Sequence, residues 1–401
     1  MFFGCSLGCG DDEATVVAED AGDQAGDGDG DGDAASDAGG DGDGDAATDA
    51  GGDGDGDGDA GTGGQLAITA DMANGTLSII DIDLLTEGGT RADALVDTID
   101  LSDYTPGPMA LAITPDGKTA LVSVSVGFLN LIGAGVEMGE DKLLIIDIES
   151  RAVTGEMDIG ASPMGIAVTH DSKTAFVGLL GQTAFAVVDI ENQTFETVET
   201  GATYNEELAI DDSGEVAILS YGVAGDVKTF SVDDPAGTLG GTSGITGDGA
   251  GVAFFPGTKI AYLVQAPTPL TNNVGGHDVI DVTDPTMPVA SDNLRIEMAP
   301  TSYPVTTVHA RNSVAYPAIT GGRLTIVEMK LEDDVATEVQ TVDVGPGGLL
   351  AYGVAATSDG RVLVAEPGTH TVSVVDLEAG TGFTVPWEGE AYGPTEIKVI
   401  P

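Results

Sequence analysis

The chain has 401 residues with 67 Asp and Glu against 13 Lys and Arg, a formal net charge of −54. Residues 1–64 hold 19 of the acids and no base, so residues 65–401 carry 67 − 19 = 48 acids against 13 bases, or −35. This charge excludes nucleic acid and anionic lipid surfaces as partners, and it favours a soluble monomer in a salty medium.

The first ten residues are predicted to be the remnant of a secretion signal. Apolar and small residues run up to Cys9, and acids follow at once. The segment resembles a bacterial lipoprotein box in which Cys9 is lipidated; Gly8 fits that pattern, whereas Ser6 replaces the usual Leu. A basic start and an apolar stretch of about 7–15 residues are missing, so an apolar terminus without signal function is the alternative. The resemblance implies a lipid-anchored protein of the bacterial envelope or extracellular space.

Residues 11–64 are rich in Asp, Gly and Ala and have almost nothing to bury, so we predict a disordered linker. The alternative is a calcium site, because alternate aspartates match the first half of an EF-hand loop: Asp27, Asp29, Asp31, Asp53, Asp55 and Asp57. The twelfth loop position, which needs a bidentate Glu, is Ala38 or Gly64. We therefore expect loose counterions and predict no cofactor.

From residue 65 the chain consists of short apolar runs separated by Gly, Pro, Asp and Asn, which is typical of many short strands. The segments 108–122 and 163–177 echo each other, and each reads as a strand, a hairpin turn and a second strand. A third apolar run then ends in an acid, in turn Asp81, Asp147, Asp189, Asp233, Asp281, Glu328 and Asp376. These acids are 42 to 48 residues apart, and 66 apart where the second unit has an insertion.

Seven units of four strands at this period predict an all-β fold, a seven-bladed β-propeller of four-stranded antiparallel blades over residues 65–401. The first unit lacks its first strand. The segment Pro394–Pro401 aligns with Pro108–Pro115, the first strand of the second unit. We therefore predict that the C-terminal strand completes blade 1 and leaves no free sheet edge.

The order of Pro, apolar strand, Pro-Asp-Gly-Lys turn, second strand and Val-Val-Asp strand resembles the bacterial YVTN-type β-propeller repeat. The resemblance covers Gln65–Pro401 and is strongest in the second, third and seventh units. Trp387 is the only tryptophan, which excludes WD40 repeats and the quinoprotein pattern of one tryptophan in every blade.

In a propeller the first strand of each blade lines the axis, and the loops between blades gather on one face, where we expect a ligand or partner. Five of the seven junctions carry a tyrosine, so the candidate residues are Tyr104, Tyr204, Tyr303, Tyr352 and Tyr392, together with Glu206. The alternative is that these rings pack between blades. The insertions Val126–Asp141 and Ala266–Gly276 are predicted to join second to third strands on the same face.

Alignment of the first strands places mostly Gly and Ala toward the axis, with Glu207, Glu396 and Lys398 as exceptions. Such charges are costly in a narrow channel unless they are paired or solvated. A Glu396–Lys398 pair or channel water is one explanation; the other makes Glu207 and Glu396 general acid/base residues or cation ligands. The four histidines are predicted in turns without ligand spacing, so no zinc or copper site is expected.

The leading functional hypothesis is a non-catalytic binding or scaffold propeller, with an extracellular or envelope protein or a small ligand as partner. The rival is a lactonase-like hydrolase with a carboxylate or metal site at the channel mouth, because seven-bladed lactonases resemble these repeats. An electron-transfer accessory subunit is a third hypothesis and rests on fold analogy alone.

Overall fold

A computed structural model describes residues 64–125, 141–203, 205–221, 226–243, 245, 248–266, 274–297, 304–348, 351–387 and 393–401. The predicted anchor residue Cys9 and the six aspartates of the acidic segment lie outside these residues. So do three of the candidate tyrosines, Tyr204, Tyr303 and Tyr392.

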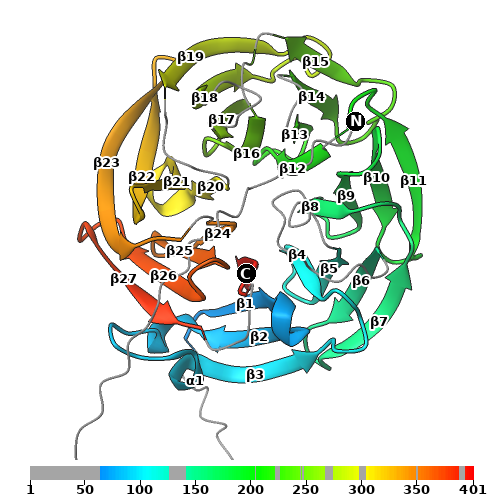
Figure 1. Cartoon of the computed structure of the whole chain (residues 1–401). Coiled ribbons are helices and arrows are strands. Elements are labelled where there is room, and N and C mark those ends of the chain that lie inside the picture. The colour runs from blue at the N-terminus through cyan, green and yellow to red at the C-terminus, as the bar shows by residue number, and fades with distance from the viewer. Residues whose placement is uncertain are drawn as a thin grey trace, which may run out of the picture. The chain divides into compact units, whose positions relative to one another are not determined.

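The described strands form seven four-stranded antiparallel sheets arranged around one axis (Figure 1). Blade 1 contains β28 (Glu396–Val399), β1 (Leu66–Asp71), β2 (Thr76–Asp81) and β3 (Leu95–Asp100). Blade 2 contains β4 (Pro108–Ile113), β5 (Thr119–Val124), β6 (Lys142–Asp147) and β7 (Ala152–Met157). Blade 3 contains β8 (Pro163–Val168), β9 (Thr174–Leu179), β10 (Ala184–Asp189) and β11 (Thr194–Glu199).

Blade 4 contains β12 (Asn205–Ile210), β13 (Val216–Tyr221), β14 (Asp226–Ser231) and β15 (Gly240–Ser243). Blade 5 contains β16 (Asp248–Phe254), β17 (Ile260–Ala266), β18 (Val274–Asp281) and β19 (Val289–Glu297). Blade 6 contains β20 (Thr306–Val308), β21 (Ser313–Thr320), β22 (Arg323–Glu332) and β23 (Val335–Pro346). Blade 7 contains β24 (Gly353–Ala356), β25 (Arg361–Glu366), β26 (Thr371–Asp376) and β27 (Thr381–Pro386). The predicted number of blades and of strands in each blade is confirmed.

The C-terminal strand closes the ring as predicted. β28 pairs antiparallel with β1, with Ala70 opposite Glu396 and Ala67 opposite Val399. Because β28 occupies the innermost position of blade 1, the described edge of β1 is paired, and blade 1 is built from both ends of the propeller sequence.

A threonine and an aspartate hold the hairpin between the first and second strands of a blade. In blade 2, Thr114 Oγ1 donates to Asp116 Oδ1 (2.6 Å) and accepts from Thr119 N (3.0 Å), while Lys118 N donates to Asp116 Oδ1 (3.2 Å). The same pairing recurs at Thr169 with Asp171 and at Thr357 with Asp359. The Thr-x-Asp spacing in the repeated turns therefore comes from local side-chain-to-backbone hydrogen bonding.

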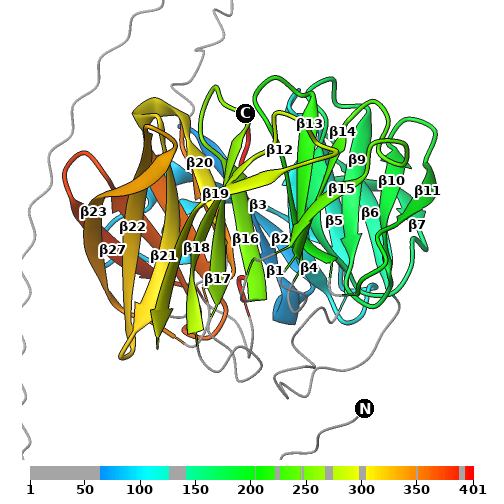
Figure 2. The same cartoon turned by 90° about the horizontal axis from the view of Figure 1, so that it is seen from above.

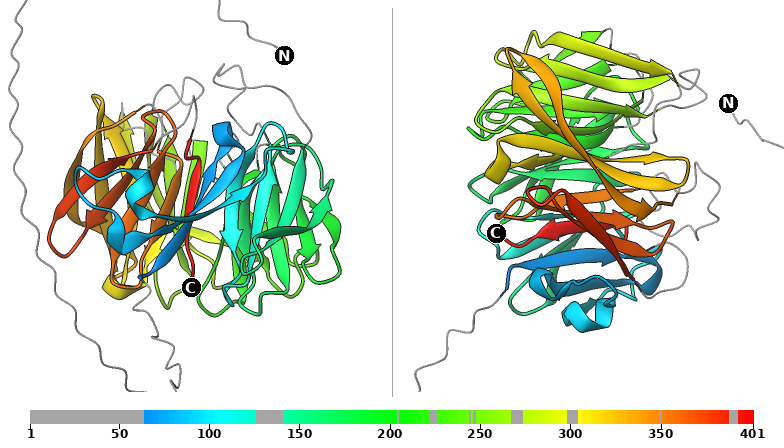
Figure 3. Two further views of the ribbon diagram at one scale, coloured as in Figure 1. Left: turned by 90° about the horizontal axis from the view of Figure 1, so that it is seen from below. Right: turned by 90° about the vertical axis from the view of Figure 1, so that its left-hand side faces the viewer.

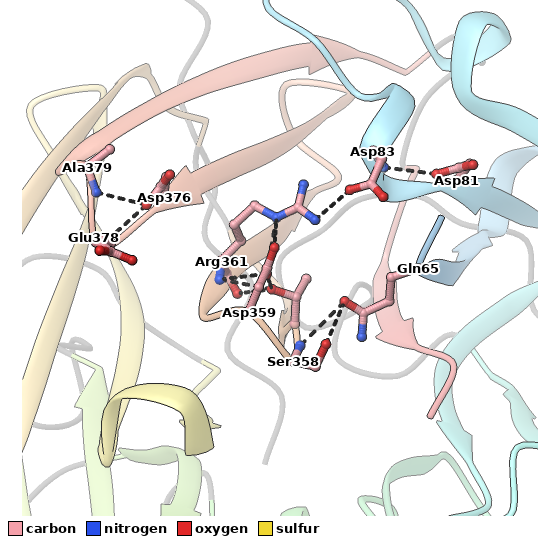
Figure 4. Close-up of polar contacts among 10 residues, drawn as sticks. Gln65, Asp81, Asp83, Ser358, Asp359, Arg361, Asp376, Glu378 and Ala379 are labelled. Atoms are coloured by element: carbon pink, nitrogen blue, oxygen red, sulfur yellow. Dashed lines mark hydrogen bonds and ion pairs between the residues drawn. The ribbon is translucent and has the colours of Figure 1, made fainter. Parts of the chain in front are cut away.

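Five of the acids that end the third strands hold the next turn. Asp147 Oδ1 accepts from Ser150 N (2.7 Å). Figure 4 shows the same role for Asp376, whose Oδ1 accepts from Glu378 N (2.9 Å) and Ala379 N (2.8 Å). Glu328 differs, because it is buried and pairs with Arg311.

The two ends of the ring differ in their connections. We call the end that carries the turns between first and second strands the hairpin face, and the opposite end the loop face. The C-terminus follows β28 and marks the hairpin face, at the top in Figure 2 and at the bottom of the left panel in Figure 3. No helix in the described part of the chain is long and apolar enough to cross a membrane.

Packing follows the position of each strand within its blade. β9, a second strand, is almost wholly buried, whereas β11, an outermost strand, is mostly exposed. Apolar side chains of neighbouring blades join in shared clusters; one of them brings Ile68 and Leu77 of blade 1 against Leu111 and Val122 of blade 2. The ring is therefore held together by blade-to-blade apolar burial.

Two sequence predictions need correction. The segment predicted as an insertion at Ala266–Gly276 is partly strand, because β17 ends at Ala266 and β18 begins at Val274. His277 is not in a turn. It lies within β18 and is buried, and its ring centroid is 5.1 Å from that of Tyr262. Successive side chains of a strand point to opposite faces, and His277 is on a face that is buried in the blade.

Candidate functional site in the axial channel

Four of the seven innermost strands carry a β-bulge at the level of the predicted axial residues. The pairing register shifts between Asn205 and Leu208 on β12, and equivalent shifts occur on β4, β8 and β16. Each bulge adds a residue and re-aims the side chains that follow. On β12 the shifted segment contains Glu206 and Glu207, and Glu207 N donates to Ser220 Oγ (3.3 Å).

Two glycines make room for the axial carboxylates. A Cβ at Gly165 would clash with the backbone of Glu206 and Glu207, and a Cβ at Gly353 would clash with the backbone and carboxylate of Glu396. Glycine at these positions lets adjacent inner strands approach closely. The glutamate side chains lie against the resulting gaps.

Glu207, Glu396 and Lys398 form one electrostatic group, which we call the axial trio. Lys398 Nζ lies 3.2 Å from Glu396 Oε1. The exposed fraction is 34% for the Lys398 side chain and 6% for that of Glu396, so the lysine is the more solvent-accessible partner of the pair. This contact is one of the explanations that the sequence allowed for charges at the axis.

Burial raises the pKa of Glu207 to about 8, with a further rise from the charge of Glu396 and an opposing effect from Lys398. Glu207 is half-buried. Burial also raises the pKa of Glu396, against the lowering effect of Lys398 and of its hydrogen bond from Ile397 N. At neutral pH this arrangement favours a protonated Glu207 beside the Glu396–Lys398 contact.

On the loop-face side of the axial trio, the channel is crossed by Tyr352. Its hydroxyl lies 3.6 Å from Met164 Sδ, and both side chains are buried. Tyr352 immediately precedes β24 and Met164 lies on β8, strands on opposite sides of the axis (Figure 1). This contact narrows access to the carboxylates from the loop face.

On the other side of the axial trio, a cavity of about 380 Å³ occupies the half of the channel nearest the hairpin face. All seven inner strands line it, one residue from each being Ile113, Ala167, Ala209, Ala253, Thr307, Ala355 and Lys398. His170, in the first hairpin of blade 3, also lines it. The volume lies toward the small end of the roughly 300–1,000 Å³ range of ligand pockets.

The cavity walls are more polar than their side chains suggest. One edge of each inner strand pairs with the second strand of its blade, and the other edge faces the axis. Backbone N–H and C=O groups on that edge can bind water or a ligand, since a sheet edge presents unpaired polar groups.

The other predicted site residues are placed as follows. Tyr104 is half-buried against the apolar cluster shared by blades 1 and 2, and Tyr352 is buried over the axis. Glu206 is half-buried beside the axial trio. The role of these residues in a ligand or partner face stays a prediction. Among the described residues, no three His, Cys, Asp or Glu side chains are grouped so as to hold a metal ion.

Sequence reasoning missed a second polar group, at the seam between blades 7 and 1, which we call the seam cluster. Buried Asp71 accepts hydrogen bonds from Trp387 Nε1 (2.8 Å), from Thr69 Oγ1 (3.0 Å) and from Ser78. Arg91 Nη2 lies 3.5 Å from Asp71 Oδ2. A signal for this cluster exists in the sequence: an acid followed seven residues later by Ser recurs at Glu366 and Ser373, which are also hydrogen bonded.

Nearer the hairpin face, the same seam has an exposed set of polar contacts (Figure 4). Arg361 Nη2 of blade 7 donates to Asp83 Oδ1 of blade 1 (2.7 Å), and Arg361 Nε lies 3.0 Å from Asp359 Oδ2. Ser358 Oγ donates to Gln65 Oε1 (3.4 Å). These contacts add to the closure by β28.

Fold and site together define this protein as a seven-bladed β-propeller with an axial cavity beside a buried carboxylate–lysine group. No protein-family model matches the chain, and no curated protein sequence matches it significantly.

Three solved structures are similar to it in fold. A functionally unknown protein from Desulfotomaculum acetoxidans DSM 771 has 13% identity and a TM-score of 0.63, over 84% of this chain and 98% of that one. Kuenenia stuttgartiensis hydrazine synthase has 16% identity and a TM-score of 0.54, over 68% and 77%. The Myceliophteria thermophila Cps50 (Swd1) β-propeller domain has 9% identity and a TM-score of 0.54, over 73% and 90%. At these identities the likenesses show the fold alone.

Proposed function

We propose that this chain is a non-catalytic binding protein of the YVTN-repeat kind, in the bacterial envelope or the extracellular space. Cys9 anchors it to lipid, residues 11–64 form a spacer, and the propeller presents its site to a small ligand or an envelope protein. The axial cavity supports this best, because all seven inner strands contribute to it. A concave site with a few polar groups is the usual form of a ligand pocket.

The test is ligand-dependent thermal unfolding of the full chain with a set of small metabolites. A molecule that binds the folded state raises the melting temperature by mass action. Ala209→Leu fills part of the cavity and should abolish the shift, whereas Ala209→Ser keeps the volume and should preserve it. Binding that is equally strong in Ala209→Leu would place the ligand elsewhere.

A lactonase-like hydrolase is the second candidate, and the pKa of Glu207 supports it. A carboxyl group that titrates at about 8 beside a second carboxylate has the properties of a general acid or base near neutral pH. Glu207→Gln would then lower the rate of δ-valerolactone hydrolysis by roughly 10²–10⁴-fold. If the intact chain does not accelerate this hydrolysis, the lactonase assignment is wrong.

A further inference from the structure

The entrance side of the axial cavity carries a distinctive charge pattern. Six blades join their first and second strands by a hairpin, and five of these hairpins contain or adjoin a basic residue: Lys118, Lys173, Lys259, Arg311 and Arg361. They are five of only 13 bases in the chain. The same hairpins also carry acids, namely Asp116, Asp171, Asp211, Asp212, Glu215 and Asp359, so the bases balance most of the negative charge there. First hairpins lie closer to the axis than the turns between third and fourth strands, because first strands are innermost.

Several of these bases are ion paired. Lys259 Nζ lies 2.5 Å from Glu215 Oε2, and Arg311 Nε lies 2.8 Å from Glu328 Oε1. Their effect at the cavity mouth is therefore to offset the surrounding acids. The negative field of the propeller is weakened where the cavity opens, and an anion meets less repulsion there than over the outer turns.

Inside the cavity, the charged group that meets a ligand is Lys398. It lines the cavity, whereas Glu396 lies behind it and is almost fully buried. The rest of the wall combines small apolar side chains, Phe254, threonine hydroxyls and strand-edge backbone groups. An ammonium at the end of a small, partly apolar chamber complements a compact organic anion.

We propose that the axial cavity binds a small organic carboxylate, which enters from the hairpin face and pairs with Lys398. This inference rests on the proposed function and specifies its ligand class. The ligand carboxylate competes with Glu396 for the ammonium, so Glu396 takes up a proton as the ligand binds. The ionisable groups around this exchange are Glu206, Glu207, Glu396, Lys398 and, on the cavity wall, His170.

The experiment is calorimetric titration of the full chain with three probes of similar shape: benzoate, benzamide and benzylamine. We expect benzoate to bind at least roughly tenfold more tightly than the neutral amide, since one charge-assisted hydrogen bond is worth about 1.5–3 kcal/mol. Benzoate binding should take up a proton, measured by comparing buffers of different ionisation enthalpy, and should weaken as pH rises.

Substitutions test whether Lys398 supplies the positive charge that binds benzoate. Lys398→Met keeps the length of the side chain and should weaken benzoate binding by roughly tenfold or more, while Lys398→Arg should retain most of it. Arg323→Met is the charge-matched control, because Arg323 is exposed and pairs with Asp343 away from the cavity. It should leave benzoate affinity unchanged, and Trp387 fluorescence should verify that every variant is folded.

The outcomes separate this inference from the proposed function. Preference for benzylamine, equal binding of all three probes, or benzoate binding that survives Lys398→Met would overturn the carboxylate assignment. If a neutral or cationic molecule binds and Ala209→Leu blocks it, the binding function stands and only the ligand class is wrong. If no probe or metabolite binds at the cavity, both fail.

Discussion

The seam cluster and the axial trio both place carboxylates inside the protein, but they satisfy them differently. Asp71 has hydrogen bonds from Thr69, Ser78 and Trp387 and the charge of Arg91, all of which oppose the rise in its pKa that burial causes. For Glu207, burial and Glu396 both raise the pKa, and Lys398 is the opposing charge among the described residues. A fully partnered buried acid is structural, whereas an incompletely compensated acid beside a cavity is available for exchange with a ligand or a proton.

The largest effect is expected from removing β28, the strand on which both regions depend. Deleting residues 394–401 removes Glu396 and Lys398 from the axial trio and leaves the inner edge of β1 unpaired. We expect loss of cooperative folding and aggregation through the open edge, measured by circular dichroism and size-exclusion chromatography. Deleting Pro401 alone is the control and should leave a folded monomer.

Asp71→Ala tests the seam cluster alone. It leaves Arg91 with Ser78 but without its buried carboxylate, and Trp387 without its acceptor, so the free energy of unfolding should fall by about 3–5 kcal/mol. Denaturant titration followed by Trp387 fluorescence measures this. Asp343→Ala removes an exposed acid that also pairs with an arginine, and it should cost about 0–1 kcal/mol. Similar losses in the two variants would contradict a structural role for the seam cluster.

Glu207→Gln tests the axial trio. It should raise the free energy of unfolding at pH 8, whereas Asp71→Ala lowers it. The pKa of Glu207 is about 8 in the folded state against an ordinary 4.5, so between these values the folded state binds more protons than the unfolded state. Stability therefore decreases as pH rises from 4.5 to 8, and the loss is complete above 8. The variant should show a flatter stability profile and exceed the parent protein at pH 8. An unchanged slope would mean that Glu207 titrates normally.

The smallest effect is expected from a substitution that displaces the Glu396 carboxylate instead of removing it. Gly353→Ala forces its new methyl group against Glu396 and should cost about 1–3 kcal/mol through overpacking, measured by denaturant titration. Gly155→Ala is the matched control, since its methyl group meets only the flexible Gln193 side chain. An equal cost in both variants would show that the approach of the inner strands at Gly353 is not tightly constrained.

The period of the closing acids and the alignment of Pro394–Pro401 were sufficient to predict seven blades and the closing strand, because each repeat carries its own turn chemistry. The alignment also placed Glu207, Glu396 and Lys398 at the axis. It did not identify the seam cluster, since Trp387 and Asp71 are 316 residues apart and meet only when the ring closes. The cavity was likewise hidden, because its position depends on Tyr352 reaching Met164 across the axis.

The pairing of β28 with β1 also determines when blade 1 can be completed during synthesis. β1 is among the first strands made, yet its inner partner β28 is made last; Ile68 and Lys398, which pair in blade 1, are 398 − 68 = 330 residues apart. Contacts of such long sequence separation form slowly. Until β28 has been made, the inner edge of β1 has no partner in blade 1.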